Sequence, residues 1–171
     1  MSRVRVSTVI QAPPARVWEA VRDISSHVEW MEDAVAIRFT SARRDGVGTT
    51  FDCDTRVGPF RLTDRMEVTE WTEGRAMGIR HVGLVQGTGR FTVRRALRGG
   101  TRFTWDERLR FPWWMGGGPG SMVAAPVLRR IWRRNLAGLK RRIEPAGADP
   151  GRRRWRDPTG GSAAGSSTGS V

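Results

Sequence analysis

The sequence is poor in the residues that build disulfide or metal sites. Its 171 residues include one cysteine, two histidines and no tyrosine. A single cysteine, Cys53, excludes an internal disulfide and a cysteine-based zinc cluster, and His27 and His81 are too few for a histidine-rich metal site. We therefore expect no metal and no cofactor. A lone thiol is typical of a reducing compartment.

Long apolar stretches are also missing. No run is long enough to span a bilayer, and the amino terminus, MSRVRVSTVIQAPP, lacks the uninterrupted apolar segment and small-residue cleavage site of a secretory signal. These absences predict a cytoplasmic protein. At this length we expect one domain that buries roughly two thirds of its unfolded surface.

Positive charge is abundant but unevenly placed. The net charge is +13, and residues 129–156 contain 11 Arg and Lys against Glu144 and Asp149. Residues 147–171 are rich in Gly, Ser and Pro, so we expect a domain over 1–146 and a disordered basic tail over 147–171. We interpret the basic end as solvated, with peripheral contact with an anionic membrane as the functional alternative. No basic recognition-helix motif indicates sequence-specific nucleic-acid binding.

The beginning of the chain predicts a strand followed by two short helices. Residues 3–11 alternate as a half-buried strand does, and Pro13 and Pro14 end this strand and begin a helix. Ser26 and Glu29 have the spacing of a capping box, which predicts that a second short helix opens at Ser26.

The rest of the chain predicts a series of strands and one long helix. Period-two runs predict strands over 35–41, 48–57, 60–71, 75–82, 85–97 and 101–111, and short loops between them indicate antiparallel neighbours. A long helix over about 121–144 is amphipathic, with Pro126 either kinking it or marking where its continuous part begins. Its apolar stripe contains Leu128, Ile131, Trp132, Leu136, Leu139 and Ile143.

Together these elements predict an α+β fold, in which a seven-stranded antiparallel sheet curves around the long C-terminal helix. The segments VIQAPPARVWEAVRDISSHVEWM and PVLRRIWRRNLAGLKRRIE resemble the START-domain and birch-pollen-allergen-like superfamily, often called SRPBCC, and within it the polyketide cyclase/dehydrase branch. The resemblance covers about residues 3–144. It implies a helix-grip fold with a cavity that holds lipids, sterols, polyketides or other apolar molecules in many relatives.

Strand alternation places three ionisable groups, Asp64, His81 and Glu107, on otherwise apolar faces that point toward the inferred interior. Buried ionisable groups cost several kcal/mol unless they are paired or hydrogen-bonded. Mutual pairing explains them structurally, and orientation of a ligand is the functional alternative. In an enzymatic form of that alternative, His81 is the general base and Glu107 or Asp64 is the acid or the orienting partner, for ring closure or dehydration of a poly-β-keto chain.

The expected ligand-binding residues are the large apolar side chains and Cys53 on the same faces and on the helix stripe. They are Phe51, Cys53, Leu62, Met66, Ile79, Phe91, Phe103, Trp105, Leu109 and Trp132. Trp113 and Trp114 lie in a glycine-rich loop, which predicts either a gate or membrane anchor, or one packed and one exposed ring.

Three hypotheses for function follow from these residues. The first is binding, and transport, of a hydrophobic small molecule such as a lipid or polyketide in an internal cavity. The second is an enzyme that acts as a polyketide cyclase, aromatase or dehydratase. The third is a protein- or membrane-interaction module that uses the basic C-terminus.

Overall fold

The structure, a computed structural model, describes residues 2–110 and 117–144. Its centre is a seven-stranded antiparallel sheet with the order β1-β7-β6-β5-β4-β3-β2. The strands are β1 (Ser2–Ile10), β2 (Ala34–Phe39), β3 (Thr50–Val57), β4 (Phe60–Thr72), β5 (Ala76–Val82), β6 (Gln86–Arg95) and β7 (Thr101–Arg110). Strands β2 to β7 form a meander, and β1 closes the order by pairing with β7. The predicted seven antiparallel strands are confirmed.

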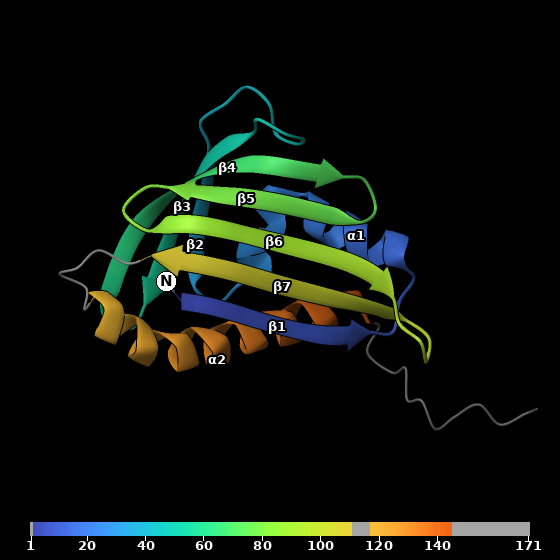
Figure 1. Ribbon diagram of the computed structural model, residues 1–171. Coiled ribbons are helices and arrows are strands. Elements are labelled where there is room, and N and C mark those ends of the chain that lie inside the picture. Colours follow the sequence, from blue (N-terminus) through green and yellow to red (C-terminus); the bar gives the residue numbers. More distant parts are fainter. Residues whose placement is uncertain (1, 111–116, 145–171) are drawn as a thin grey trace, which may run out of the picture.

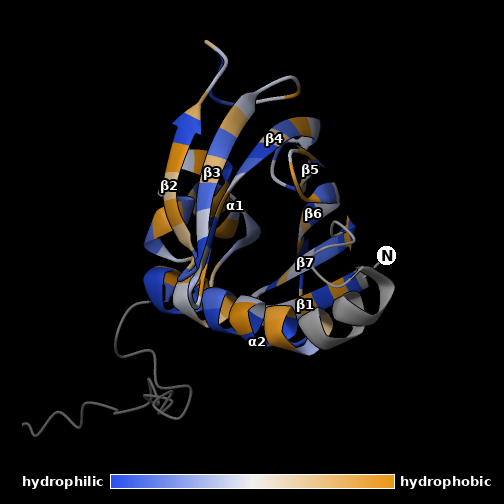
Figure 2. Cartoon of the chain, turned by 90° about the vertical axis from the view of Figure 1, so that its left-hand side faces the viewer, coloured by the Kyte–Doolittle hydropathy of each residue, from blue (hydrophilic) through white to orange (hydrophobic). Residues whose placement is uncertain are grey.

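The helices lie on one side of this sheet, which curls toward them (Figures 1 and 2). Helix α1 (Pro14–Arg22) and the short 3₁₀ helix η1 (Ile24–Glu29) connect β1 to β2, which are the two edge strands. The long helix α2 (Gly117–Ile143) packs along β1. This arrangement is the predicted helix-grip α+β fold.

The first two helices begin in different ways. Pro13 is extended, with φ −61° and ψ 150°, and Pro14 occupies the first helical position of α1, as predicted. The capping box at Ser26 is wrong, because the cap of η1 is Asp23, whose carboxylate accepts a hydrogen bond from the Ser25 amide at 3.0 Å. The Ser26 hydroxyl instead donates to the Asp23 carbonyl at 2.8 Å. Asp23 directly follows α1, so its carboxylate lies before η1 and can accept a hydrogen bond from the first turn of that helix.

Helix α2 begins at Gly117, earlier than predicted, and Pro126 lies inside it rather than at its start. Its predicted stripe is buried from Trp132 onward, through Leu136, Leu139 and Ile143, while Arg129, Arg130, Arg133 and Arg134 are exposed. Burying each large apolar side chain contributes roughly 1.5–3 kcal/mol, so this stripe fixes α2 on the sheet. None of the described helices is long and apolar enough to cross a membrane.

The core lies between the concave face of the sheet and the helices. Apolar and polar residues alternate along the strands (Figure 2), and completely buried residues come from β1, α1, η1, β4, β7 and α2. Examples are Ile10, Val17, Ile24, Val68, Phe103 and Leu139. The predicted roles of Trp113 and Trp114, and the predicted tail over 147–171, lie outside the described residues.

Candidate functional site

A row of three ionisable side chains crosses the concave face of the sheet. Asp64 of β4, His81 of β5 and Glu107 of β7 are each about 5–6% exposed. His81 Nδ1 donates a hydrogen bond to Asp64 Oδ2, and His81 Nε2 lies 3.6 Å from Glu107 Oε1. The structure therefore brings together all three residues that alternation placed on inward faces.

Two glycines of β6 allow the groups on β5 and β7 to meet across the strand between them. Gly87 pairs with His81, and Gly89 pairs with Glu107. A Cβ atom on Gly89 would lie 2.9 Å from Glu107 Oε1, which is too close for an unstrained contact. The Glu107 carboxylate can therefore occupy this position only because residue 89 has no side chain.

His81 is protonated near neutral pH. Burial lowers the pKa of the imidazole, but the hydrogen bond to Asp64 and the nearby charges of Asp64 and Glu107 outweigh this effect and raise the pKa to about 10. An imidazolium can donate a proton but cannot accept one. The role of general base that the sequence predicted for His81 does not fit a protonated ring. In a proton-transfer reaction at this site, His81 would instead serve as the acid and Glu107 as the base.

A cavity of about 60 Å³ adjoins this row and has mostly apolar walls. Its lining comes from η1 and from strands β2 to β7. Six of the expected ligand-binding residues line it, namely Phe51, Cys53, Met66, Ile79, Phe91 and Trp105, and Glu107 lines it as well. Because the walls are aromatic and thioether groups with one carboxylate, the cavity has the character of a site for a small organic molecule.

The other four expected ligand-binding residues, Leu62, Phe103, Leu109 and Trp132, do not line this cavity. Trp132 of α2 stacks on Trp105, with ring centroids 5.0 Å apart and planes inclined by 21°. Phe103 packs against Phe91 at 5.2 Å. These two rings support the cavity wall from behind.

His27 is a cavity residue that the sequence reasoning missed. Its Nε2–H donates to the Val21 carbonyl at 2.7 Å, and its ring packs edge-on against Trp30 and Phe91. Burial lowers the pKa of His27 to about 4, so the ring is neutral. The sequence does contain one indication that His27 faces the interior. It follows the apolar Ile24 by three residues, and residues three apart share a face of a 3₁₀ helix.

Four buried polar side-chain atoms lack a hydrogen-bond partner among the described residues, and one of them belongs to a cavity-lining residue, Trp105. They are Trp30 Nε1, Trp105 Nε1, His81 Nε2 and Asp64 Oδ1. A buried polar atom without a hydrogen-bond partner destabilises the folded protein by roughly 1–3 kcal/mol. A ligand that forms the absent hydrogen bond therefore gains binding free energy. Within residues 2–110 and 117–144, no cluster of three or more His, Cys, Asp and Glu side chains is placed to hold a metal ion.

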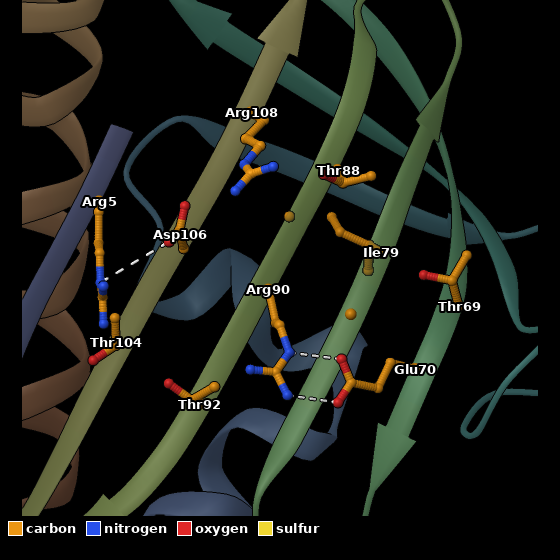
Figure 3. A pocket seen from close by; sticks show the side chains of 12 residues that line it. Arg5, Thr69, Glu70, Ile79, Thr88, Arg90, Thr92, Thr104, Asp106 and Arg108 are labelled. Carbon is orange, nitrogen blue, oxygen red and sulfur yellow. Dashed lines mark hydrogen bonds and ion pairs between the residues drawn. The ribbon is translucent and has the colours of Figure 1, made fainter. Parts of the chain in front are cut away.

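The solvent-facing side of the sheet carries a larger groove, of about 410 Å³ (Figure 3). Arg90 donates two hydrogen bonds to Glu70 there, at 2.6 and 2.7 Å, and Arg5 lies 3.9 Å from Asp106. These pairs lie at the surface, where ion pairs are worth little, and the groove also carries the arginine Arg108. We therefore take the interior cavity, with its unpaired buried groups, as the candidate site.

Comparison with known proteins identifies a family and a set of similar folds. Residues 1–144 match the family described as polyketide cyclase/dehydrase and lipid transport. The structure is similar to TTHA0849 from Thermus thermophilus (TM-score 0.72, 18% identity, covering 82% of this chain and 96% of that one). It is also similar to XoxI from Bacillus cereus (TM-score 0.67, 14% identity, covering 84% and 96%).

A third similar structure is that of the di-domain ARO/CYC protein BexL from the BE-7585A biosynthetic pathway. Its TM-score is 0.65 at 16% identity, over 84% of this chain and 50% of that one. At these identities the three structures establish a shared fold. No curated protein matches the sequence significantly.

Proposed function

The chain belongs to the polyketide cyclase/dehydrase and lipid transport family, and we propose that it binds a small, largely apolar molecule in the cavity on the concave side of its sheet. The main support is that two polar groups meet apolar walls in this cavity. They are the Glu107 carboxylate and the indole N–H of Trp105, which has no hydrogen-bond partner among the described residues. An apolar pocket with a few convergent polar groups is the usual form of a small-molecule site.

The size of the cavity limits the molecule it accepts. At about 60 Å³ it is smaller than the roughly 150 Å³ of an apolar cavity that holds benzene, so an aromatic ring, and still more a lipid or polyketide, fits only if the walls move. Three methionines, Met31, Met66 and Met77, line the cavity. Because methionine side chains are flexible and change rotamer readily, a larger guest would enter by displacing them.

Binding can be tested with toluene and benzyl alcohol as probes, followed by the NMR signals of the methionine methyl groups. We expect the signals of Met31, Met66 and Met77 to shift, because a ring in the cavity contacts them. Ile79→Phe fills the cavity and should abolish these shifts, while Val82→Phe, on the exposed side of the same strand, should leave them intact. Unshifted signals with both probes would contradict binding, and native mass spectrometry of freshly purified protein would identify a natural guest.

The enzymatic alternative is favoured by the position of His81 between two carboxylates. In a dehydration, Glu107 would take the proton α to a carbonyl, and the C–H electron pair would form the new double bond. The C–O bond at the β carbon would then break, and its hydroxyl group would leave as water with the proton of His81. Each step needs only groups that this chain supplies.

Proton removal can be measured as deuterium uptake from D₂O into the methyl group of acetophenone. We expect Glu107→Gln to abolish enzyme-dependent exchange while leaving acetophenone binding intact. Asp106→Asn, which alters the neighbouring outward-facing carboxylate, serves as the matched control. Exchange that persists in Glu107→Gln would sink the enzymatic alternative.

We also propose that this is a cytoplasmic protein whose basic end contacts anionic membranes or acidic proteins. The exposed arginines of α2, such as Arg129 and Arg130, support this role, and the sequence of residues 147–171 adds four more arginines. Deleting residues 147–171 should reduce sedimentation with phosphatidylserine-containing vesicles without altering Tm. Equal sedimentation of both chains would argue against a role for that segment.

A further inference from the structure

We propose that the molecule bound in the cavity carries a cationic amine that interacts with Glu107, an inference that rests on the proposed binding function. Glu107 lines the cavity and is only 5% exposed. Its ion-pair partner among the described residues is His81, whose Nε2 lies 3.6 Å from Glu107 Oε1 and whose Nδ1 is already hydrogen-bonded to Asp64. A buried carboxylate needs close hydrogen bonds as well as a nearby charge, so this one offers a binding point for a donor that bears positive charge.

The charges around the cavity leave an excess of one negative charge. Asp64 accepts the hydrogen bond of the His81 imidazolium, so the row contains two carboxylates and one cation. Burial keeps His27 neutral by lowering its pKa to about 4, and it keeps Cys53 neutral by raising its pKa to about 11. A single positive charge on the bound molecule would therefore balance the interior.

Arg90 contributes to the lining of the cavity but does not place its charge there. Its guanidinium lies on the outer face of the sheet and donates two hydrogen bonds to Glu70 (Figure 3). Because this charge points away, it does not compensate Glu107.

The walls of the cavity are suited to an ammonium group with an apolar substituent. Phe51, Phe91 and Trp105 present aromatic rings, and aromatic ring faces attract cations. The N–H group of Trp105, which has no hydrogen-bond partner among the described residues, is left for an acceptor oxygen elsewhere on the same molecule. The site thus favours an aromatic or aliphatic amine over a neutral hydrocarbon of equal size.

Benzylamine and benzyl alcohol test the inference, because they share one shape and differ in charge at pH 7. Titration calorimetry with the full chain should show benzylamine binding about tenfold more tightly, the gain typical of a charge-assisted hydrogen bond. Glu107→Gln should remove this preference, so that the variant binds the two compounds with similar affinity. Asp106→Asn, the adjacent outward-facing residue, should change neither affinity.

The outcomes separate this inference from the proposed function. If neither compound binds, the proposed binding function fails. If both bind equally, or benzyl alcohol binds more tightly, binding stands and the amine inference is overturned. If Asp106→Asn weakens benzylamine as much as Glu107→Gln does, the attraction is a surface effect and the inference is also overturned.

A measurement on the unaltered protein covers the case in which Glu107→Gln fails to fold. Benzylamine should shift the ¹³C NMR signal of the Glu107 side-chain carboxyl group, whereas benzyl alcohol should leave that signal in place. A signal that benzylamine does not move would overturn the inference.

Discussion

Gly89 of β6 lies directly opposite Glu107 of β7, and the Glu107 carboxylate fills the space that a side chain at position 89 would need. Ile79 of β5 borders the same space, with its Cγ1 atom 3.0 Å from where a Cβ on Gly89 would lie. The contact between Glu107 and His81 thus depends on a residue that takes no part in it. This relationship makes the buried row sensitive to a single methyl group.

Replacing Gly89 with alanine should displace Glu107 from His81. Because His81 then loses part of its stabilising charge, its pKa should fall from about 10 toward its ordinary value. Overpacking should also lower the free energy of unfolding by roughly 1–3 kcal/mol. An NMR titration of the His81 ring measures the first effect, with the buried His27 ring as internal reference. Thr88→Ala, at an exposed neighbouring position, is the control, and an unchanged His81 midpoint in Gly89→Ala would refute the prediction.

The stability of the protein should depend on pH through His81. Its pKa in the folded protein, about 10, is above the ordinary value of 6.5, so the contribution is complete below pH 6.5 and is lost as the pH rises toward 10. The upper bound of this contribution is about 5 kcal/mol. Urea unfolding at pH 6, 8 and 10 measures the free energy of unfolding of the protein and of His81→Gln. The difference between the two should shrink as the pH increases. A constant difference across this range would contradict the raised pKa.

Cys53 should react slowly with thiol reagents in the folded state. Burial raises the pKa of its thiol from 9.0 to about 11, which lowers the fraction of reactive thiolate at pH 8 about a hundredfold. The reaction with Ellman's reagent should therefore be at least that much slower in buffer than in 6 M guanidinium chloride. Because the chain has one cysteine, the absorbance change reports this site alone. Comparable rates in the two solvents would contradict the described burial.

Asn135 should be a major anchor of α2. It is completely buried, its Oδ1 accepts from the Glu32 amide at 2.9 Å, and its Nδ2 donates to Asp33 Oδ1 at 2.6 Å. Asn135→Leu would leave both partners unpaired, so we expect a loss of roughly 1–3 kcal/mol in the free energy of unfolding. The exposed neighbour Arg134→Ala is the control and should change this value by less than about 0.5 kcal/mol. Equal stability of the two variants would show that these hydrogen bonds contribute little.

The regular elements could be predicted closely from the sequence. The strand predicted over 60–71 is Phe60–Thr72, and the one predicted over 101–111 is Thr101–Arg110. Alternation also placed Phe103, Trp105 and Glu107 correctly on the buried face. These predictions succeed because side-chain direction in a strand follows directly from residue spacing.

Other features depended on interactions that spacing does not encode. The cap of η1 is Asp23 rather than Ser26, because two acceptors close in sequence competed for the same turn. The buried polar residues His27 and Asn135 were missed, since their partners lie in other segments of the chain. Sequence periodicity shows which face is apolar but not which polar residue on it finds a partner.

By itself, the sequence determined the seven strands, the amphipathic long helix and the inward direction of Asp64, His81 and Glu107, because these follow from local periodicity. Only the tertiary structure decided that the three side chains meet, because their contact depends on strand order, on pairing register and on the space at Gly89. It also decided the protonation of His81 and the size of the cavity. Both depend on groups that are distant in the sequence and are brought together only when the sheet curls.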